Sequence, residues 1–326
     1  MALVGCRGLP ETRSQPARRA GRHRPRRGYT PFLVALAVLA VATGWWRLAV
    51  RPEEARITRA SLATPSPSFP APSVPAPTAS PLTGGDPSLQ IERAMLPHRT
   101  EADAIAAVQR FLAAGEPIRC GGGTQPVMAL TFEDGPGPST ERTARLLERH
   151  GLEATFFLNG TGLDAFSSAV PAALRVGEVG NHGWSHRELT GADPDRLTAE
   201  MDTLQARLAE LAGTPPRLFR PPYEALDDGV MDRARSLGIL TVLSSVDVGD
   251  GEGADAAAVW AAMQRGARPG AIVALRENEE VTRALLPDFV ALLEERGLHA
   301  VTVPDLLAID PPTPEQLRDG TCPGSA

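Results

Sequence analysis

Short β-forming runs alternate with helical patterns between Cys120 and Cys322, and this alternation constrains the fold more than any other feature. The predicted strands are residues 127–132, 154–159, 178–181, 218–220, 240–245, 271–275 and 300–303. The predicted helices are residues 140–150, 194–212, 227–236, 254–265 and 279–296. Because a helix supplies the crossover between parallel strands, this pattern favours an α/β fold with a mostly parallel sheet. Seven strand units predict a closed or nearly closed barrel.

The first 50 residues have the pattern of a membrane-targeting segment. Residues 1–30 hold eight Arg and one acid, Glu11, so their charge is +7 and the net charge of -6 leaves -13 for the rest. An acidic bulk argues against a nucleic-acid partner. Residues 31–50 carry a single charge, Arg47, and a span of about 20 apolar residues is what a transmembrane helix needs.

The Arg excess before this span predicts a cytoplasmic segment at 1–30 and a signal anchor at 31–50, with Trp45 and Trp46 at the interface. The folded part would then be membrane-anchored outside the cytoplasm. A cleaved signal peptide is the alternative, because Ala40, Val41 and Ala42 form a small-x-small site. In that case the protein would be secreted.

The next segments divide the remaining chain. Residues 51–86 are rich in Pro, Ser, Ala and Thr, a composition that predicts a disordered, extended linker. Residues 87–122 contain a helical pattern at 101–114 and are interpreted as a lead-in helix and loop. The main domain is expected at 123–326.

Cys120 and Cys322 bracket the main domain, whereas Cys6 lies in the basic head. Outside the cytoplasm disulfides persist, so we expect Cys120 and Cys322 to be bonded to each other. Two unrelated free thiols are the alternative. Two cysteines this far apart do not suggest a zinc knuckle.

Chemically reactive side chains lie at the ends of the predicted strands. They are Glu133 and Asp134 after the first strand, His182 after the third, Arg220 at the end of the fourth, Asp247 after the fifth and Arg276 at the end of the sixth. In barrels of alternating strands and helices the active site lies at the carboxyl ends of the strands. We therefore expect these side chains to meet at one end of the barrel.

Two imidazoles and one carboxylate form a typical site for a zinc-like ion and leave one position for a water of lowered pKa. Asp134, His182 and His186 are the candidate ligands. Two His four residues apart are more often ordinary surface or core residues, and the acidic pair at another strand end is what favours the metal site. Glu133 is then the candidate general base.

Arg220 is a candidate for orienting that base, because a guanidinium holds a carboxylate in a fixed fork. The residues after it, Pro221, Pro222 and Tyr223, stiffen the backbone and offer an aromatic side chain to a sugar groove. Taken alone, Arg-Pro-Pro-Tyr is an ordinary turn sequence.

Together these motifs resemble the polysaccharide deacetylases with a NodB homology domain, a carbohydrate esterase type, over about residues 121–310. The family motif Thr-Phe-Asp-Asp-Gly-Pro is similar to residues 131–136, and His-(Ser/Thr)-x-x-His is similar to residues 182–186. Arg-Pro-Pro-Tyr-Gly is similar to residues 220–224, Asp-Trp to residues 250–251 and Leu-His-Asp to residues 275–277.

The resemblance implies a distorted, TIM-barrel-like (β/α)7 fold and a divalent metal, zinc or cobalt or a similar ion, held by Asp134, His182 and His186. It places Glu133 in the position of the base. It also implies that the residue at 276, tuned by Asp250, protonates the leaving amine. The implied substrates are peptidoglycan, chitin-like or xylan polysaccharides.

The sequence departs from the family pattern at several positions. Glu133 replaces Asp and is longer by a methylene, a shift of roughly an ångström that can cost on the order of 100-fold in rate. Gly251 replaces Trp and opens the site, Gly183 lacks a hydroxyl, and Glu224 adds a carboxylate. Arg276 replaces His, and a guanidinium with a pKa above about 12 cannot cycle a proton near neutral pH.

Two hypotheses remain. The first is a metal-dependent deacetylase of N-acetylated cell-wall or related polysaccharide, with a rate lowered by about 100- to 10,000-fold if general acid catalysis is lost. The second is a catalytically silent, membrane-tethered glycan-binding pseudoenzyme. In place of donating a proton, Arg276 would pair with Asp250, Asp247 or Glu224, or supply a fixed positive charge. The predicted catalytic residues are Glu133, Arg220, Asp250 and Arg276, and the predicted substrate groove is Tyr223, Pro222, Leu275 and Asp247.

Overall fold

The computed structural model describes residues 100–324. The predicted cytoplasmic segment, membrane anchor and linker therefore lie outside the described residues, as do residues 87–99 of the lead-in segment. Within residues 100–324 no helix combines the length and the apolar character needed to cross a membrane. The predicted lead-in helix is confirmed as α3 (Glu101–Ala114), which Thr100 caps at its start and which ends at Gly115 with a left-handed φ of 82°.

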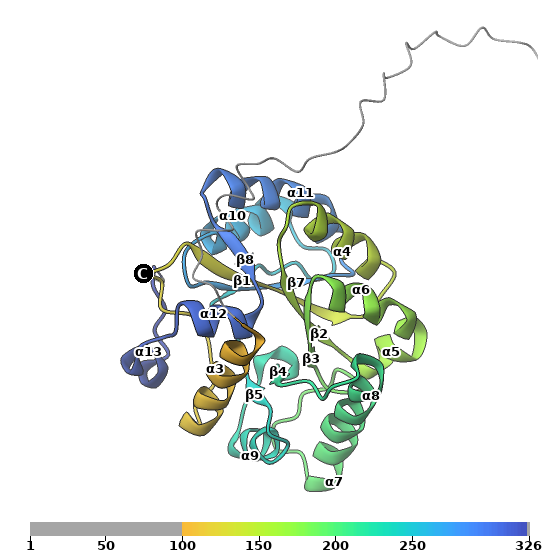
Figure 1. Ribbon diagram of the computed structural model, residues 1–326. Helices are drawn as coiled ribbons and strands as arrows, with labels where there is room; N and C mark the ends of the chain where they lie inside the picture. The colour runs from red at the N-terminus through yellow and green to blue at the C-terminus, as the bar shows by residue number, and fades with distance from the viewer. Residues whose placement is uncertain (1–99, 325–326) are drawn as a thin grey trace, which may run out of the picture. The chain divides into compact units, whose positions relative to one another are not determined.

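The described residues contain one sheet of eight parallel strands (Figure 1). The strands are β1 (Val127–Gly135), β2 (Ala154–Leu158), β3 (Gly177–Asn181), β4 (Leu218–Phe219), β5 (Leu240–Thr241), β6 (Val246–Asp247), β7 (Ile272–Arg276) and β8 (His299–Val301). Their order is β5-β4-β3-β2-β1-β7-β6, and β8 pairs with the beginning of β1. The predicted alternation of parallel strands and helices is confirmed.

The predicted strand at 240–245 is instead two short strands with different partners. The amide of Val242 donates to the carbonyl of Phe219 beside β4, whereas the amide of Ser245 donates to the carbonyl of Ile272 beside β7. One segment thus reaches both ends of the sheet and curls it into an incompletely closed barrel. Because the chain changes partner within a few residues, it cannot continue as one regular strand. The last predicted strand is also too long, since Val303 begins a helix.

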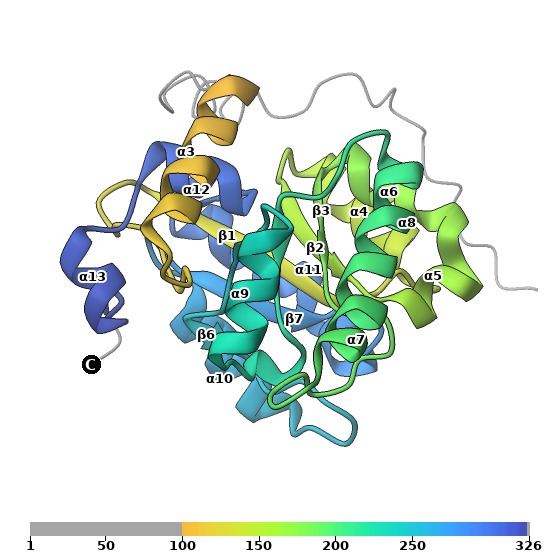
Figure 2. The same cartoon turned by 90° about the horizontal axis from the view of Figure 1, so that it is seen from below.

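Helices cover the outer face of the sheet in both views (Figures 1 and 2). Those packed on this face are α4 (Thr140–Arg149), α6 (Val170–Arg175), α8 (Thr203–Ala212), α10 (Ala256–Gly266) and α11 (Glu280–Glu295). Along β1 the residues Met128, Leu130 and Phe132 belong to this core cluster. Val127 and Ala129 alternate with them and pack in a second cluster with α3 and α12 (Val303–Ile309), as the period of two requires.

The remaining helical elements are short or lie at the ends of strands. They are α5 (Gly160–Phe166), η1 (Ser167–Ala169), α7 (Pro194–Leu197), the π-helical η2 (Thr198–Asp202), η3 (Pro222–Glu224), α9 (Asp228–Ser236) and α13 (Pro314–Asp319). Sequence patterns did not predict α5, α6, α12 or α13. Each of these four helices is only six or seven residues long, too short to show a helical period clearly.

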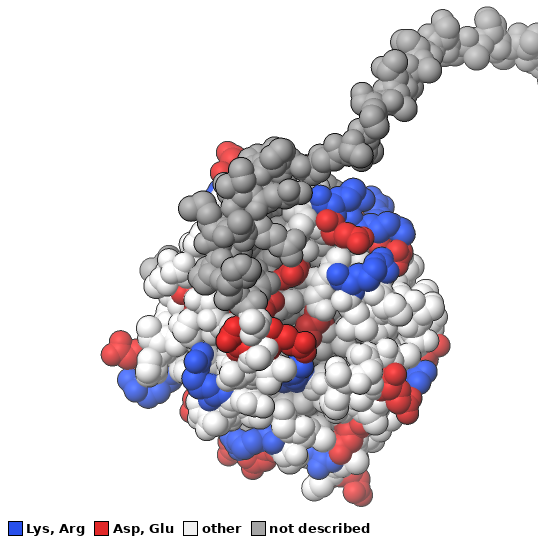
Figure 3. Space-filling view, in the orientation of Figure 1, with Lys and Arg blue, Asp and Glu red and all other residues white. Residues whose placement is uncertain are grey.

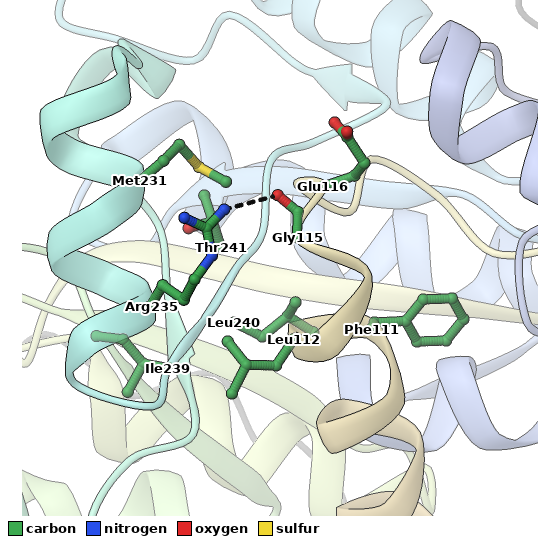
Figure 4. A pocket seen from close by; sticks show the side chains of 9 residues that line it. All are labelled: Phe111, Leu112, Gly115, Glu116, Met231, Arg235, Ile239, Leu240 and Thr241. Atoms are coloured by element: carbon green, nitrogen blue, oxygen red, sulfur yellow. Dashed lines mark hydrogen bonds between the residues drawn. The ribbon is translucent and has the colours of Figure 1, made fainter.

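The end of α3 packs against α9 (Figure 4). Apolar side chains of Leu112 and Leu240 line this seam, and Arg235 donates a hydrogen bond of 3.3 Å to the Gly115 carbonyl. The remaining cavity has about 10 Å³, which is no larger than a single water requires. This seam is therefore a packing contact and not a ligand site.

The predicted disulfide between Cys120 and Cys322 is confirmed, with the two residues 202 positions apart. It joins the segment before β1 to the segment after α13. Asp310 ties the same region a second time, because its carboxylate accepts hydrogen bonds from the amides of Gly123 and Thr124 at 2.7 and 3.0 Å. Both ends of the barrel sequence are thereby fixed to one another.

Candidate functional site

The acidic pair at the end of β1 faces the barrel's carboxyl end. Glu133 follows Val127, Ala129 and Thr131 on the inner face of the strand and is 8% exposed. Asp134 has a φ of 66°, in the left-handed region that residues other than glycine rarely adopt. This conformation ends the alternation of faces, and both carboxylates lie beside His182.

The two histidines come from the loop after β3. His182 is 1% exposed, and its Nδ1 lies 2.8 Å from the carbonyl oxygen of Arg220. Since a carbonyl only accepts, Nδ1 carries the hydrogen and Nε2 presents a lone pair toward Asp134. Burial lowers the pKa of His182 and so favours the neutral form that binds a metal.

Sequence reasoning missed two residues that shape this loop. The side chain of Asn181 accepts from the amide of Gly183 at 3.0 Å, and Glu200 accepts from the amide of Ser185 at 2.8 Å. Glu200 comes from the π-helical turn η2, far along the chain, so no local motif marks it. Asn181 directly precedes His182 and is fully buried. A search for metal-ligand motifs overlooks such a residue, because it supports the loop and is not itself a ligand.

The three predicted ligands converge. The Nε2 atoms of His186 and His182 lie 3.0 and 3.7 Å from Asp134 Oδ1, and candidate ligand atoms of all three residues fall within 4.8 Å of one another. Asp134 Oδ1 and His182 Nε2 are buried and lack a hydrogen-bond partner within residues 100–324. Buried polar atoms are otherwise almost always satisfied. These residues therefore fit a divalent ion of the zinc type, which takes two imidazoles and a carboxylate.

Arg220 holds Glu133 from inside the barrel. Its side chain is fully buried and lies over the ring of Phe157 at 4.4 Å, and Nη1 donates to Glu133 Oε1 at 2.8 Å and to Thr131 Oγ1 at 2.7 Å. Other guanidinium nitrogens donate to the carbonyls of Val242 and Leu243. Burial is the largest single influence and would raise the pKa of Glu133, but the charge and hydrogen bond of Arg220, together with the charges of His182 and Arg276, outweigh it and hold that pKa below its usual range.

Thr131 is a further residue that the sequence reasoning did not assign to the site. It lies two residues before Glu133 on the same face, and its hydroxyl accepts from Arg220 while it donates to the Val273 carbonyl at 2.7 Å. The period-two spacing from Glu133 is the signal that could have found it. The base and its orienting arginine are thus part of one buried hydrogen-bonded group.

Arg276 pairs with Asp250, as one of the predicted alternatives stated. Its amide and its Nη1 donate to the two carboxylate oxygens of Asp250 at 2.8 and 2.9 Å, and Thr282 also donates to this fully buried acid. Nη1 lies 3.5 Å from Asp247, and Nε lies 3.8 Å from Oδ2 of the candidate ligand Asp134. Burial opposes the charge of Arg276, but Asp247 and Asp250 raise its pKa further above the ordinary value.

Glu224 does not contact Arg276. Its carboxylate accepts from the amide of Ser244 at 2.6 Å, and burial raises its pKa. Tyr223 before it is 67% exposed, has its ring 4.9 Å from that of His186, and donates to the His186 carbonyl at 3.3 Å. An exposed aromatic side chain beside a candidate ligand is where a sugar ring would stack.

Of the other predicted groove residues, one lies exposed at the site and two are buried. Asp247 is half exposed beside Arg276, whereas Pro222 is buried beneath the loop. Leu275 was assigned to the groove wrongly, because it is fully buried in the core cluster on the outer face of the sheet. Neighbouring strand residues point to opposite faces, so Arg276 at the site places Leu275 away from it. At Gly251 a side chain would meet no atom within 4 Å, and this edge of the site is open.

These observations define a class of protein: an α/β domain with a three-residue candidate metal centre at the carboxyl ends of parallel strands and an arginine-bound carboxylate beside it. Residues 121–242 match the polysaccharide deacetylase family. The family's sequence motifs and the curled parallel sheet agree with this match. The match over residues 121–242, the relatives and the solved structures of similar fold support a polysaccharide deacetylase family member.

Relatives and solved structures support the assignment. The chain is 32% identical over 185 residues to a peptidoglycan-N-acetylglucosamine deacetylase of Listeria monocytogenes, covering 56% of this chain and 39% of that protein. It is 29% identical over 183 residues to a chitin deacetylase of Pestalotiopsis, covering 54% and 61%. It thus spans less than two thirds of either relative. A Bacillus anthracis structure is described as a mutant CE4 family pseudoenzyme with restored enzymatic activity. It matches with a TM-score of 0.55 and 25% identity, and the match covers 59% of this chain and 71% of that one.

Proposed function

We propose that this domain is a metal-dependent deacetylase that hydrolyses the acetamide C–N bond of an N-acetylated polysaccharide such as peptidoglycan or a chitin-like glycan. The observation that carries the proposal is the pair of buried, unpartnered lone pairs on Asp134 and His182, with Glu133 held ionised by Arg220 next to them. The relatives from Listeria and Pestalotiopsis are deacetylases of peptidoglycan and of chitin, which supports the substrate class.

Asp134, His182 and His186 would hold the ion, and zinc or cobalt suits this donor set. A bound divalent ion polarises the acetyl carbonyl and lowers the pKa of a water in its open position. Glu133 accepts the proton of the attacking water, and Arg220 fixes the carboxylate in the geometry for that transfer. Tyr223 offers an exposed ring to the sugar.

Departure of the amine requires a proton. Arg276 cannot supply it, because its pKa is raised above an already high value and its guanidinium is bound to Asp250. The protonated Glu133 then returns the proton to the amine nitrogen as the C–N bond breaks. Because one carboxyl must serve both proton transfers, we expect slow turnover. The rate would be lowered by about 100- to 10,000-fold if general acid catalysis were fully lost.

A silent glycan-binding pseudoenzyme is the second candidate, and the observation in its favour is the same Arg276–Asp250 pair. The Bacillus anthracis structure of similar fold is described as a pseudoenzyme whose activity was restored by mutation. In this second case the ligands and the exposed Tyr223 would still bind metal and glycan, and only the proton donor would be lacking.

Acetate release decides between the two candidates. The full-length chain, loaded with zinc or cobalt, is incubated with N-acetylglucosamine oligomers and with peptidoglycan, and acetate is quantified. We expect slow release that a chelator abolishes, that Glu133→Gln removes, and that Arg276→His raises. If neither the wild type nor Arg276→His releases acetate while both bind glycan, the deacetylase proposal fails and the pseudoenzyme remains.

We further propose that the domain works outside the cytoplasm, tethered by residues 31–50. The support is the Arg-rich head before an apolar span, together with the disulfide of the folded domain. Alkaline extraction of membranes and protease treatment of intact cells test the proposal. After alkaline extraction the chain is expected to stay in the membrane pellet. Protease added to intact cells is expected to cleave the folded domain. Recovery of a shortened chain from the medium would instead support the cleaved signal peptide.

A further inference from the structure

A cavity separate from the candidate metal centre is lined by arginines. It lies between α4 and α11, has a volume of about 190 Å³, and is lined by Arg142, Thr143, Arg145, Leu146, Arg149, Arg283, Leu286 and Pro287. The charged residues in this lining are all arginines. Basic side chains gather over α4 and α11, with acidic ones among them (Figure 3, upper right). We call this cavity the arginine groove.

Two of its four arginine side chains have no partner within residues 100–324. Arg145 is bound to Glu141 at 2.8 Å, and Arg283 donates to the carbonyl of Asn278. The side chains of Arg142 and Arg149 are exposed and make no hydrogen bond or ion pair with another residue of the described range 100–324. Two guanidinium groups in the groove are therefore available to a ligand.

The arrangement is electrostatically costly without a ligand. Arg142, Arg145 and Arg149 follow one another at spacings of three and four residues on one face of α4, where like charges repel. Arg283 adds a fourth charge from α11 across the groove. Glu141 offsets part of this charge, but it is shared between Arg145 and Arg175. An anion between the two helices would remove the repulsion.

We infer that the arginine groove binds a linear phosphodiester polymer. A guanidinium fork matches phosphate oxygens. The two non-bridging oxygens of a phosphodiester share one negative charge and point in different directions, so one phosphate can join arginines of both helices. A planar carboxylate is satisfied by one fork. The apolar side chains of Leu146, Leu286 and Pro287 in the lining suit the carbon chain between phosphates.

The spacing of the arginines along α4 favours a polymer over a single anion. The arginines of α4 are about one helical turn, roughly 5 Å, apart, and each can take a successive charge. A membrane surface is a poorer match, because the exposed large hydrophobic residues of the described range, Phe166 and Tyr223, lie on neither α4 nor α11. The groove thus lacks an apolar anchor for lipid.

The groove also lies close to the candidate metal centre. Arg283 binds the carbonyl of Asn278, and the side chain of Asn278 donates to the carbonyl of Asp134 at 3.1 Å. Two hydrogen bonds therefore separate a groove arginine from a candidate ligand residue. A polymer held here would keep the domain on a phosphate-bearing cell wall while the metal centre meets a glycan.

Binding to a fluorescent poly(glycerol phosphate) tests the inference with the full-length chain. The variant R142Q/R149Q removes the two unpartnered charges and should weaken binding by at least tenfold. The matched control R265Q/R318Q removes the same charge from exposed positions on α10 and α13 and should change the affinity less than twofold. Circular dichroism checks that both variants fold. High salt should weaken wild-type binding.

Three results would overturn the inference. The first is the absence of wild-type binding, and the second is equal loss in both double variants, which means nonspecific attraction. The third is a different preferred anion, either polyglutamate binding as tightly as the phosphate polymer or phosphatidylglycerol vesicles binding in its place. Addition of a metal chelator should leave polymer binding unchanged, so the result does not depend on whether the domain is a deacetylase.

Discussion

At the scale of single residues, Arg276 controls the charge beside the candidate metal ligands. Its Nε lies 3.8 Å from Asp134 Oδ2, so a divalent ion at this carboxylate would lie close to a permanent positive charge. Repulsion between charges a few ångströms apart is worth on the order of a kcal/mol or more even when well screened. The residue at 276 therefore bears on metal affinity as well as on proton transfer.

Two substitutions separate these effects. Arg276→Gln and Arg276→His both remove the permanent charge, and each should tighten zinc binding on the order of tenfold in isothermal titration calorimetry. Only the imidazole can donate a proton, so only Arg276→His should also raise acetate release. Unchanged zinc affinity in both variants would show that the guanidinium does not oppose the ion.

A second prediction for a single residue concerns Glu277 and the pH dependence of stability. It is 1% exposed and accepts from Thr140, and burial raises its pKa from 4.5 to about 7. A folded-state pKa above the unfolded value gives stability that is complete below pH 4.5 and is lost as the pH rises to about 7. The loss corresponds to about 3 kcal/mol.

Glu277→Gln should abolish this loss. In metal-free buffer, urea unfolding should find the variant close to wild type near pH 4.5 and more stable by about 2 to 3 kcal/mol at pH 8. Glu148→Gln on the exposed face of α4 is the matched control and should leave the pH profile unchanged. A wild-type stability that stays level from pH 5 to pH 8 would contradict the raised pKa.

At the scale of elements, the start of α5 supports the histidine loop. The amides of Gly160 and Thr161 donate to the carbonyls of Gly183 and Trp184 at 3.2 and 3.0 Å. A side chain at Gly160 would come within 2.2 Å of the Trp184 ring, so this close approach requires a glycine. The contact fixes the loop that carries both His182 and His186.

Gly160→Ala should therefore displace the loop. We expect the free energy of unfolding to fall by about 1 to 3 kcal/mol, as in other overpacked sites, and zinc affinity to fall at least tenfold. Gly229→Ala in α9 serves as control, because its nearest neighbour would be 3.4 Å away and its helix gains propensity. Zinc binding of Gly160→Ala equal to wild type would mean that α5 does not position the ligands.

At the scale of the whole described domain, one covalent link joins the two ends of the barrel sequence. The Cys120–Cys322 disulfide spans 202 residues, and a loop of this length restricts the unfolded chain strongly. The double variant C120S/C322S should lose about 3 to 5 kcal/mol of unfolding free energy, measured with urea.

The Asp310 hydrogen bonds would still hold residues 123 and 124 in this variant, so its folded structure and zinc binding should persist. A reducing agent should then destabilise the wild type and leave the variant unaffected. Equal stability of wild type and variant in oxidising buffer would show that the link restricts nothing.

Features that reside in short segments could be predicted from the sequence. The periods of two and 3.6 gave the alternation of strands and helices, and the positions of Glu133, Asp134, His182 and His186 at strand ends predicted their convergence. The disulfide followed from the number and placement of cysteines. These predictions rest on local backbone geometry and on side-chain chemistry, which a linear sequence displays.

Which distant groups meet became known only from the folded arrangement. The division of 240–247 between two sheet edges, the burial of Leu275, the choice of Asp250 as partner of Arg276, and the arginine groove all depend on strand register and sheet curl. These follow from packing among segments that lie far apart in the sequence. Local patterns carry no record of that packing, because side chains on one face of a helix or strand look alike whichever neighbour they contact.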